Sequence, residues 1–228
     1  MFYGGIDWLL LLPAMLFALI AQGMVKSAYA KYSQIGASSR ITGDQVARLL
    51  LNQGGAGDVT VEQIAGQLTD NYDPRKRVLH LSEGVFGSSS LAALGIAAHE
   101  TGHALQHHEH YMPLIARNVV FPVARIGSTL AFPLFFAGMI FGSGTRVLMD
   151  IGILLFVGAV AFSVITLPVE FNASQRAIAL LKSQSYLGPE ELVGAKKVLR
   201  AAAMTYVAST ATAVMQLFRL IMIRNSRD

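Results

Sequence analysis

The sequence predicts a helix-rich membrane protein that carries a small α+β body between its apolar segments. Hydrophobic residues make up 53% of the 228 residues and charged residues only 14%, whereas soluble domains carry about 25% charged residues. The mean hydropathy is +0.48, and several apolar runs have the length of about 20 residues that a membrane-spanning helix needs. Polar stretches with strand-like segments separate these runs, so the α+β body is expected outside the bilayer.

Composition also limits the chemistry of the chain. The net charge of +4 is modest, and no basic patch with interleaved aromatic residues occurs, so no nucleic-acid partner is expected. The chain contains no cysteine, which excludes disulfides, thiolate catalysis and cysteine-bound zinc. Any metal ion must therefore be bound by histidine, aspartate or glutamate.

The first apolar run covers residues 6–25 and is predicted to be an uncleaved transmembrane anchor, with the anchor segment at residues 1–30. Residues 28–30 resemble a signal-peptide cleavage site, but no lysine or arginine precedes the apolar run. Positive charges follow it instead, at Lys26, Lys31 and Arg40. This bias predicts that the N-terminus lies outside and that the following residues lie in the cytoplasm. The membrane is expected to be a bacterial cell membrane.

Residues 31–118 are more polar and are predicted to form the α+β body. Residues 42–51 have the periodicity of an amphipathic helix, which ends near a Gly-Gly pair. Residues 59–61 and 78–81 have the composition of short strands, and the turn at Asp73-Pro74 precedes the second.

Residues 119–168 are predicted to form a transmembrane hairpin of two apolar helices, 119–142 and 147–167. Pro122 and Pro133 fall inside the first helix and are expected to kink it. The connection between the helices is short enough to require a tight turn.

Residues 169–228 are predicted to form a C-terminal helical part on the same side of the membrane as the body. Pro168 is expected in the first turn of a new helix. Lysine and arginine are frequent after Pro168, and this places the segment in the cytoplasm. The last apolar stretch, residues 201–218, contains several hydroxyl side chains, so we expect it to pack on the body or to lie at the membrane surface rather than to span.

The residues His99-Glu100-Thr101-Gly102-His103 form an H-E-x-x-H motif. On a helix, the two histidines lie on one face with Cβ atoms about 5–6 Å apart, so both rings can reach one metal ion. In zinc metalloproteases this motif supplies two metal ligands and a glutamate base. Serines 88–90 precede the apolar start of this segment and are candidate N-caps. The motif therefore predicts zinc at His99 and His103 with Glu100 as the catalytic base; a histidine pair without metal is the alternative.

A catalytic zinc site needs a third protein ligand, and Glu170 is the preferred candidate. Two predicted spans separate it from His103, so the chain has returned to the same membrane side. An acidic side chain at a membrane boundary also needs a partner. Asp150 is the alternative, because in site-2-type intramembrane proteases an aspartate from a later span completes the site, but it lies near the outer end of its predicted span.

The histidines after the motif are not expected to be ligands. His107, His108 and His110 continue on the same helix, and a straight helix does not fold three successive turns around one tetrahedral ion. A metzincin-type extension would need glycine and histidine where the chain has Gln106 and Glu109. These residues are therefore interpreted as a polar helix end.

Three segments, residues 68–82, 97–104 and 167–174, resemble the YugP-type membrane zinc metallopeptidase family, and the likeness covers nearly the whole chain. The resemblance implies that His99 and His103 bind zinc and that Glu100 activates water. More distantly, the chain is similar to HtpX-like and prenyl-protein-protease-like gluzincins, in which a glutamate after a membrane hairpin is the third ligand, matching Glu170. Those relatives usually carry a histidine-orienting aspartate four residues later, where this chain has Ser174.

The expected function is that of a zinc endopeptidase at the cytoplasmic membrane surface, with one zinc ion per chain. Peptide or protein substrates, membrane proteins among them, and the lipid bilayer are the expected partners. The alternatives are an intramembrane protease completed by Asp150 and a non-enzymatic membrane zinc protein. An intact Glu100 argues against the last, because a structural zinc site needs no base.

Candidates for substrate binding lie next to the motif and in the C-terminal part. The strand at residues 78–81 precedes the motif helix, so Leu79, His80 and Leu81 are candidates for pairing with an extended substrate by strand addition. Tyr206, His80 and Arg176 are candidates for stabilising the oxyanion, although a structural role explains each of them as well.

Overall fold

The computed structural model describes residues 9–141 and 145–226, and contacts divide the chain into two compact units. The unit called here the helical unit comprises Met1–Ile20, Ile115–Pro168 and Thr205–Asp228. The mixed unit comprises Ala21–Leu114 and Val169–Met204. The predicted start of the first apolar run, at residue 6, and most of the turn between the hairpin helices lie outside the described residues.

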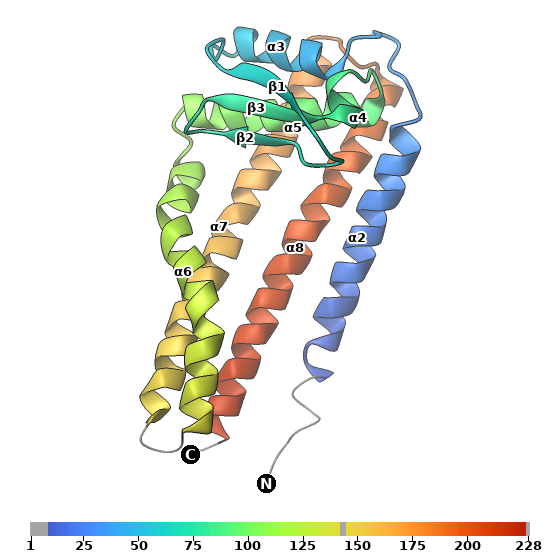
Figure 1. The fold of residues 1–228 in the computed structure, drawn as a ribbon. Coiled ribbons are helices and arrows are strands. Elements are labelled where there is room, and N and C mark those ends of the chain that lie inside the picture. The colour runs from blue at the N-terminus through green and yellow to red at the C-terminus, as the bar shows by residue number, and fades with distance from the viewer. Residues whose placement is uncertain (1–8, 142–144, 227–228) are drawn as a thin grey trace. The chain divides into compact units, whose positions relative to one another are not determined.

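The mixed unit contains the end of one long helix, a three-stranded sheet and three further complete helices, and it also receives parts of two long helices, α7 and α8 (Figure 1). From the N-terminus, the first described elements of the chain are α2 (Leu12–Tyr32), α3 (Gly43–Gln53), β1 (Thr60–Ile64), β2 (Asn71–Asp73), β3 (Val78–Ser82), α4 (Glu83–Phe86) and α5 (Leu91–His108). The predicted helix and both predicted strands are therefore confirmed, and β2 is an element that the sequence analysis missed.

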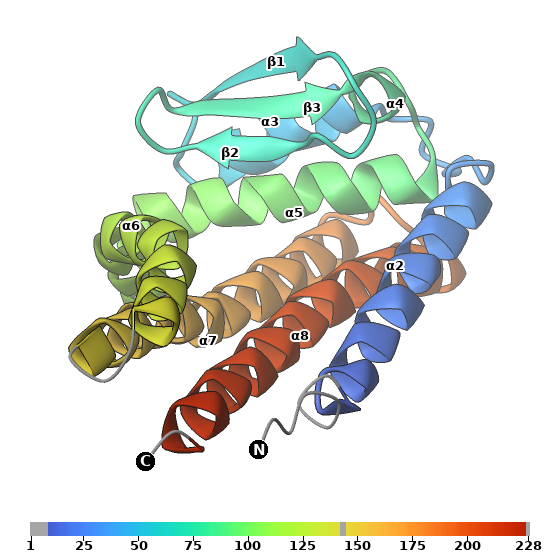
Figure 2. The same ribbon diagram turned by 60° about the horizontal axis from the view of Figure 1, so that its bottom comes forward.

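The sheet has the order β1-β3-β2, with β3 parallel to β1 and antiparallel to β2 (Figure 2). Both edges of β3 are thus hydrogen-bonded to neighbouring strands, and Leu79 and Leu81 are fully buried. The His80 ring is hydrogen-bonded to Asn71 on β2, with its Nδ1 3.1 Å from the Asn71 Oδ1. The prediction of strand addition at Leu79 and His80 is wrong, because both edges of these residues are paired, with β1 and with β2. Leu81 is paired with β1 alone, and its role in substrate binding stays a prediction.

β2 is short, and its sequence gives little strand signal. It has three residues, and the turn that follows is held by the Asp73 side chain, whose Oδ1 accepts hydrogen bonds from the backbone N–H groups of Arg75 at 2.8 Å and Lys76 at 3.2 Å. These bonds lower the pKa of Asp73. The antiparallel pairing with β3, rather than local propensity, therefore defines the strand.

The core of the mixed unit lies between the sheet and the helices α3 and α5. The helix α3 packs on β1, and α5 packs on β2 and β3, while the two helices also pack on each other. The side chains in this core are apolar and almost fully buried, and include Val46, Leu50, Val61, Leu79, Leu81, Leu94, Ala97, Leu181 and Val198. Removing these side chains from water is the main favourable term in the stability of the unit.

The helix α5 begins where the sequence predicts it. The Ser90 Oγ accepts a hydrogen bond from the Ala93 N–H at 3.2 Å, so Ser90 is the N-cap among the three candidate serines. Most residues of α5 are buried on all sides, as expected for a helix that is covered by other elements around its circumference.

The helical unit contains most of α6 (Met112–Ile140), the first part of α7 (Arg146–Ser183) and the last part of α8 (Pro189–Asn225). Small residues allow α6 and α7 to pack closely: a Cβ atom on Gly152 would lie 2.6 Å from the Ala131 carbonyl oxygen, and one on Gly127 would lie 2.7 Å from that of Leu155. This packing is typical of membrane helices. Large apolar side chains such as Val119 and Leu154, which are 69% and 71% exposed, face outward.

Four of the described helices, α2, α6, α7 and α8, are long and apolar enough to cross a membrane. The predicted helix-rich membrane fold with a small sheet is thus confirmed. The expectation for residues 201–218 is not supported, because these residues belong to α8, a single helix of 37 residues that meets the length and hydropathy of a span.

The prediction that Pro168 begins a new helix is wrong. The helix α7 continues through Pro168 to Ser183, and α6 likewise continues through Pro122 and Pro133. Beyond Pro168, Val169, Ala173, Ala177 and Leu181 are fully buried. Their packing offsets the cost of about 3 kcal/mol that proline imposes inside a helix.

We predict that Leu50→Ala destabilises the protein by about 2–5 kcal/mol, because it leaves a cavity in the core of the mixed unit. Leu49→Ala is the matched control: the side chain is the next one on α3 and is 40% exposed, so a loss of about 0.5 kcal/mol is expected. Thermal unfolding of both variants in detergent, followed by circular dichroism, measures the difference. Equal losses would contradict the described core.

Candidate metal centre

His99 and His103 on α5 meet Glu170 on α7 within the mixed unit. The Nε2 atom of His99 lies 3.3 Å from the Glu170 Oε2, and that of His103 lies 3.5 Å from the same oxygen. One potential ligand atom from each of the three residues fits within a group no wider than 4.8 Å. The structure thus brings together the three residues that the sequence analysis selected as ligands.

A close approach of two backbones makes this meeting possible. A Cβ atom on Gly102 would lie 2.8 Å from the Ala173 carbonyl oxygen and 3.2 Å from the Ala173 Cα, so only glycine fits at this position without displacing α7. Gly102 is next to His103 on α5, and Ala173 lies one turn after Glu170 on α7. The crossing therefore carries Glu170 to the histidine face of α5.

The second ring nitrogen of His103 is held by Gln106. The His103 Nδ1 lies 3.0 Å from the Gln106 Oε1, while the Gln106 Nε2 donates hydrogen bonds to the Val169 carbonyl oxygen and to the Asn172 Oδ1, both at 2.9 Å. Because the amide nitrogen faces two acceptors, the amide oxygen must face the histidine. The His103 Nδ1 therefore carries the proton, and the lone pair is on Nε2, toward Glu170.

The acceptor role of Asn172 is fixed in turn by Arg176. The Arg176 Nε donates to the Asn172 Oδ1 at 2.8 Å, and the Arg176 Nη1 forms an ion pair with the Glu109 Oε2 at 2.7 Å. The Arg176 guanidinium also lies 5.9 Å from the centre of the Tyr111 ring. These contacts give Arg176 a positioning role, which explains the residue without a direct role in stabilising an oxyanion.

Ser174 occupies the corresponding place beside His99. Its Oγ lies 3.1 Å from the His99 Nδ1, so the serine hydroxyl holds the ring nitrogen that points away from Glu170. The sequence analysis noted Ser174 in place of an aspartate, and the structure shows that the serine still contacts a histidine of the cluster. It does so without adding a negative charge.

The donor set fits a zinc ion. Two imidazole Nε2 atoms and one carboxylate are ligands that zinc accepts, and the Nδ1 atom of each imidazole has a side-chain partner. The side chains of His99 and His103 are only 13% and 12% exposed, and that of Glu170 is 5% exposed. Burial of a carboxylate is costly unless a cation or a donor compensates it, and a metal ion bound between the three residues would do so.

Glu100 lies on α5 directly after His99 and is partly buried.

The other histidines of this segment are hydrogen-bonded to a residue outside the cluster or exposed, as expected for side chains that are not ligands. The His107 Nδ1 lies 2.9 Å from the Tyr72 hydroxyl on β2, and burial together with nearby positive charge lowers the pKa of His107. His108 and His110 are exposed.

Two further sequence candidates lie in the helical unit. Asp150 forms an ion pair with Arg224, with the Asp150 Oδ1 2.8 Å from the Arg224 Nε. Asp150 does not belong to the group of potential metal ligands that occurs among the described residues. Tyr206 is on α8 and is 38% exposed, and its role in substrate binding stays a prediction.

Sequence reasoning missed Gln106 and Asn172. Gln106 follows His103 by three residues, a spacing that places both side chains on one helix face, and this spacing is the signal that could have identified it. Asn172 is recognisable only from the crossing of α5 and α7. Both are polar side chains on apolar helices, and such residues need specific partners.

Comparison with known proteins agrees with this site. Residues 7–225 match the family described as "Putative neutral zinc metallopeptidase". The chain belongs to this family. It is also 48% identical over 209 residues to the "Putative membrane protease YugP" of Bacillus subtilis (strain 168), an alignment that covers 91% of this chain and 92% of that protein. No solved structure was found to match the chain.

Membership of the neutral zinc metallopeptidase family confirms the resemblance inferred from the three sequence segments. It agrees with the donor set of the cluster, and the YugP relative agrees with the four long apolar helices.

We predict that Gln106→Leu lowers zinc affinity by about 10- to 100-fold, because the His103 Nδ1 loses its acceptor and the ring loses its fixed orientation. Thr101→Val is the control, since Thr101 is equally buried on α5 but its hydroxyl bonds only the Ala97 carbonyl, at 2.8 Å. Competition with a fluorescent zinc chelator measures both affinities. Unchanged affinity in Gln106→Leu would show that Gln106 does not position His103.

We also predict that Gly102→Ala destabilises the protein by about 1–3 kcal/mol through overpacking and reduces bound zinc, because the added methyl group displaces Ala173 and with it Glu170. Gly23→Ala on α2 is the control, because nothing lies within 4 Å of a Cβ atom there. Zinc content by mass spectrometry and the unfolding temperature are measured together. Full zinc content in Gly102→Ala would contradict the role of the crossing.

Proposed function

We propose that this chain is a zinc-dependent endopeptidase anchored in the bacterial cell membrane, with zinc held by His99, His103 and Glu170. The observation that carries the proposal is the convergence of these three side chains beside Glu100 in a member of the neutral zinc metallopeptidase family. The relative from Bacillus subtilis, whose name describes a membrane protease, supports the membrane setting and the reaction class.

Peptide hydrolysis needs an activated water, a proton acceptor and a proton donor to the leaving amine. Zinc bound by this cluster would act as a Lewis acid on the scissile carbonyl and would lower the pKa of a bound water toward about 7. The Glu100 carboxylate takes the proton of the attacking water and passes it to the leaving nitrogen. Gln106 keeps His103 in the tautomer whose Nε2 is free to bind zinc, and the Ser174 hydroxyl holds the orientation of the His99 ring.

The substrate is expected at β2 rather than at β3. Within the described part of the chain β2 is an edge strand, and it packs on α5, whereas the other edge strand, β1, packs on α3. Tyr72 on β2 reaches His107 on α5, one turn beyond His103. An extended peptide added to β2 would therefore run along the helix that carries Glu100.

The distribution of lysine and arginine along the chain supports one orientation of the helices in the membrane. Lysine and arginine follow the apolar part of α2 and flank the connection between α7 and α8, at Lys26, Lys31, Lys182, Lys196, Lys197 and Arg200. This bias supports a cytoplasmic mixed unit and an N-terminus outside the cell. The three candidate ligands His99, His103 and Glu170 belong to the mixed unit, so cleavage would take place on the cytoplasmic side.

The proposed ligand set is tested by the zinc content of purified protein. Wild type is expected to hold about one zinc ion per chain, as a three-ligand catalytic site does, and Glu170→Gln is expected to lose it. Asp150→Asn is the matched control, because it neutralises a carboxylate that is paired with Arg224 instead. Zinc retained in Glu170→Gln but lost in Asp150→Asn would favour the intramembrane alternative.

The proposed base is tested by Glu100→Gln. This variant keeps the three ligands, so zinc content should match wild type, while the rate of casein cleavage should fall by about 10²- to 10⁴-fold, the usual contribution of a general base. Glu62→Gln serves as the control, since Glu62 is an exposed carboxylate on β1, the strand that packs on α3. Zinc-loaded wild type without proteolysis would favour a non-enzymatic zinc protein.

A further inference from the structure

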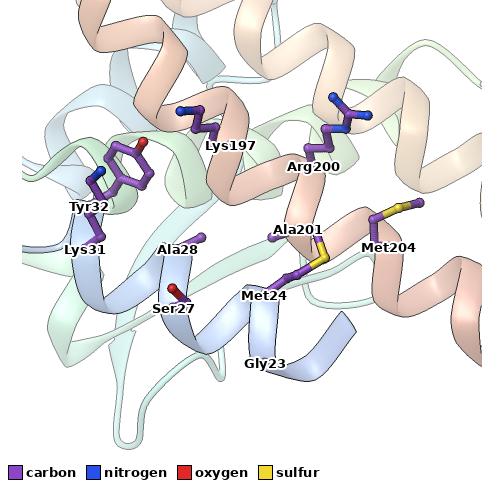
Figure 3. Close-up of a pocket in the computed structure, with 10 residues that line it drawn as sticks. All are labelled: Gly23, Met24, Ser27, Ala28, Lys31, Tyr32, Lys197, Arg200, Ala201 and Met204. Carbon is purple, nitrogen blue, oxygen red and sulfur yellow. The ribbon is translucent and has the colours of Figure 1, made fainter. Parts of the chain in front are cut away.

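A pocket of about 660 Å³ lies between α2 and α8 in the mixed unit, and none of the three potential metal ligands lines it (Figure 3). Its walls come from these two helices alone. The lining residues are Gly23, Met24, Ser27, Ala28, Lys31, Tyr32, Lys197, Arg200, Ala201 and Met204. The pocket has no part in the function proposed above.

Each helix contributes one stripe of side chains to the pocket. On α2 the stripe contains Met24, Ala28 and Lys31, and on α8 it contains Lys197, Ala201 and Met204, with the spacings of three, four and seven residues that define one helix face. Each stripe therefore has a lysine at one end and a methionine at the other. Seven residues of helix correspond to about 10 Å, so the lysine end and the methionine end are separated, and Arg200 lies between them on α8.

The two helices are in contact beside the basic end of the pocket. A Cβ atom on Gly194 would lie 2.8 Å from the Tyr32 Cδ1, so α8 passes directly against the end of α2 at this point. From Tyr32 toward Met24, and from Gly194 toward Met204, the chain enters the apolar part of each helix. The lysines are consequently near the crossing, and the methionines lie farther from it along each helix, as Figure 3 shows for the labelled side chains.

Among the described residues, no carboxylate compensates the positive charge of the pocket. No carboxylate is among the ten lining residues, and in the part of the chain that the structure describes no acid forms an ion pair with Lys31, Lys197 or Arg200. Elsewhere in the mixed unit Arg48, Arg77 and Arg176 each pair with a carboxylate. Three cations thus surround one pocket without a counter-charge.

We propose that this pocket binds one anionic phospholipid. The phosphate and headgroup contact Lys31, Lys197 and Arg200, and the first part of an acyl chain packs along Met24, Ala28, Ala201 and Met204. Basic pockets between membrane helices on the cytoplasmic side are suited to anionic headgroups, and the pocket's volume is in the range of small-molecule sites. A wholly polar anion would leave the methionine end unfilled. The change from basic to apolar side chains along the pocket therefore favours a lipid.

Native mass spectrometry of the full chain, purified in detergent with its zinc, tests this proposal. The probes are dioleoylphosphatidylglycerol and dioleoylphosphatidylcholine, which have the same acyl chains and differ in headgroup charge. Wild type is expected to retain one phosphatidylglycerol at least tenfold more strongly than phosphatidylcholine. The triple variant Lys31→Gln, Lys197→Gln and Arg200→Gln is expected to lose this preference.

The matched control is the triple variant Lys26→Gln, Lys182→Gln and Lys196→Gln. It removes the same charge from the same region of the chain, and none of its residues lines the pocket; Lys182 and Lys196 line a different hollow, on α7 and α8. Phosphatidylglycerol retention should stay at the wild-type value. An equal loss in both triple variants would overturn the proposal, because the preference would then reflect the general positive charge of the surface.

A steric variant tests the pocket without changing its charge. Ser27 is exposed on the wall of the pocket, so Ser27→Phe should fill part of it and reduce phosphatidylglycerol retention, while zinc content reports that the mixed unit is folded. Equal retention of the two lipids by wild type, or displacement of phosphatidylglycerol by millimolar inorganic phosphate, would also overturn the proposal. None of these measurements depends on proteolytic activity.

Discussion

The contact between Gly102 and Ala173 is the constraint on which the rest of the metal centre depends. Glu170 and Ser174 flank Ala173 on α7, and both reach histidines of α5 only because the two backbones nearly touch. A side chain at position 102 would separate the helices by more than the reach of these short contacts. The glycine inside the H-E-x-x-H motif therefore serves packing, while its neighbours are the candidate metal ligands and base.

The crossing of α5 and α7 also provides hydrogen-bond partners for polar side chains on these apolar helices. Gln106 is fully buried, and a buried amide without partners would cost about 1–3 kcal/mol. Its three hydrogen bonds, to His103, Val169 and Asn172, remove this cost and also orient a metal ligand. Ser174 and Gln106 are neutral, so they contact the histidines without adding a negative charge, whereas an orienting aspartate would add one.

Features that depend on local sequence or on membrane topology could be predicted, and features that depend on distant packing could not. Local patterns in the sequence identify Ser90 as a candidate helix cap and place His99, Glu100 and His103 in one motif. The choice of Glu170 as third ligand follows from counting the predicted membrane spans between it and His103. In contrast, the continuity of α7 through Pro168 depends on tertiary contacts made after the proline, and β2 exists because β3 pairs with it. The burial of β3 between two strands likewise results from the sheet order, which no local pattern encodes.

The nitrogen and oxygen donors of the cluster have a consequence for how the centre responds to its chemical surroundings. A zinc site built from thiolates is lost when oxidants convert its cysteines to disulfides or sulfenic acids. This chain has no cysteine, and the residues grouped as ligands are two histidines and a glutamate. Oxidative stress therefore has no thiol to attack at the candidate metal centre, whereas acid and chelators would compete directly for the imidazoles or for a bound ion.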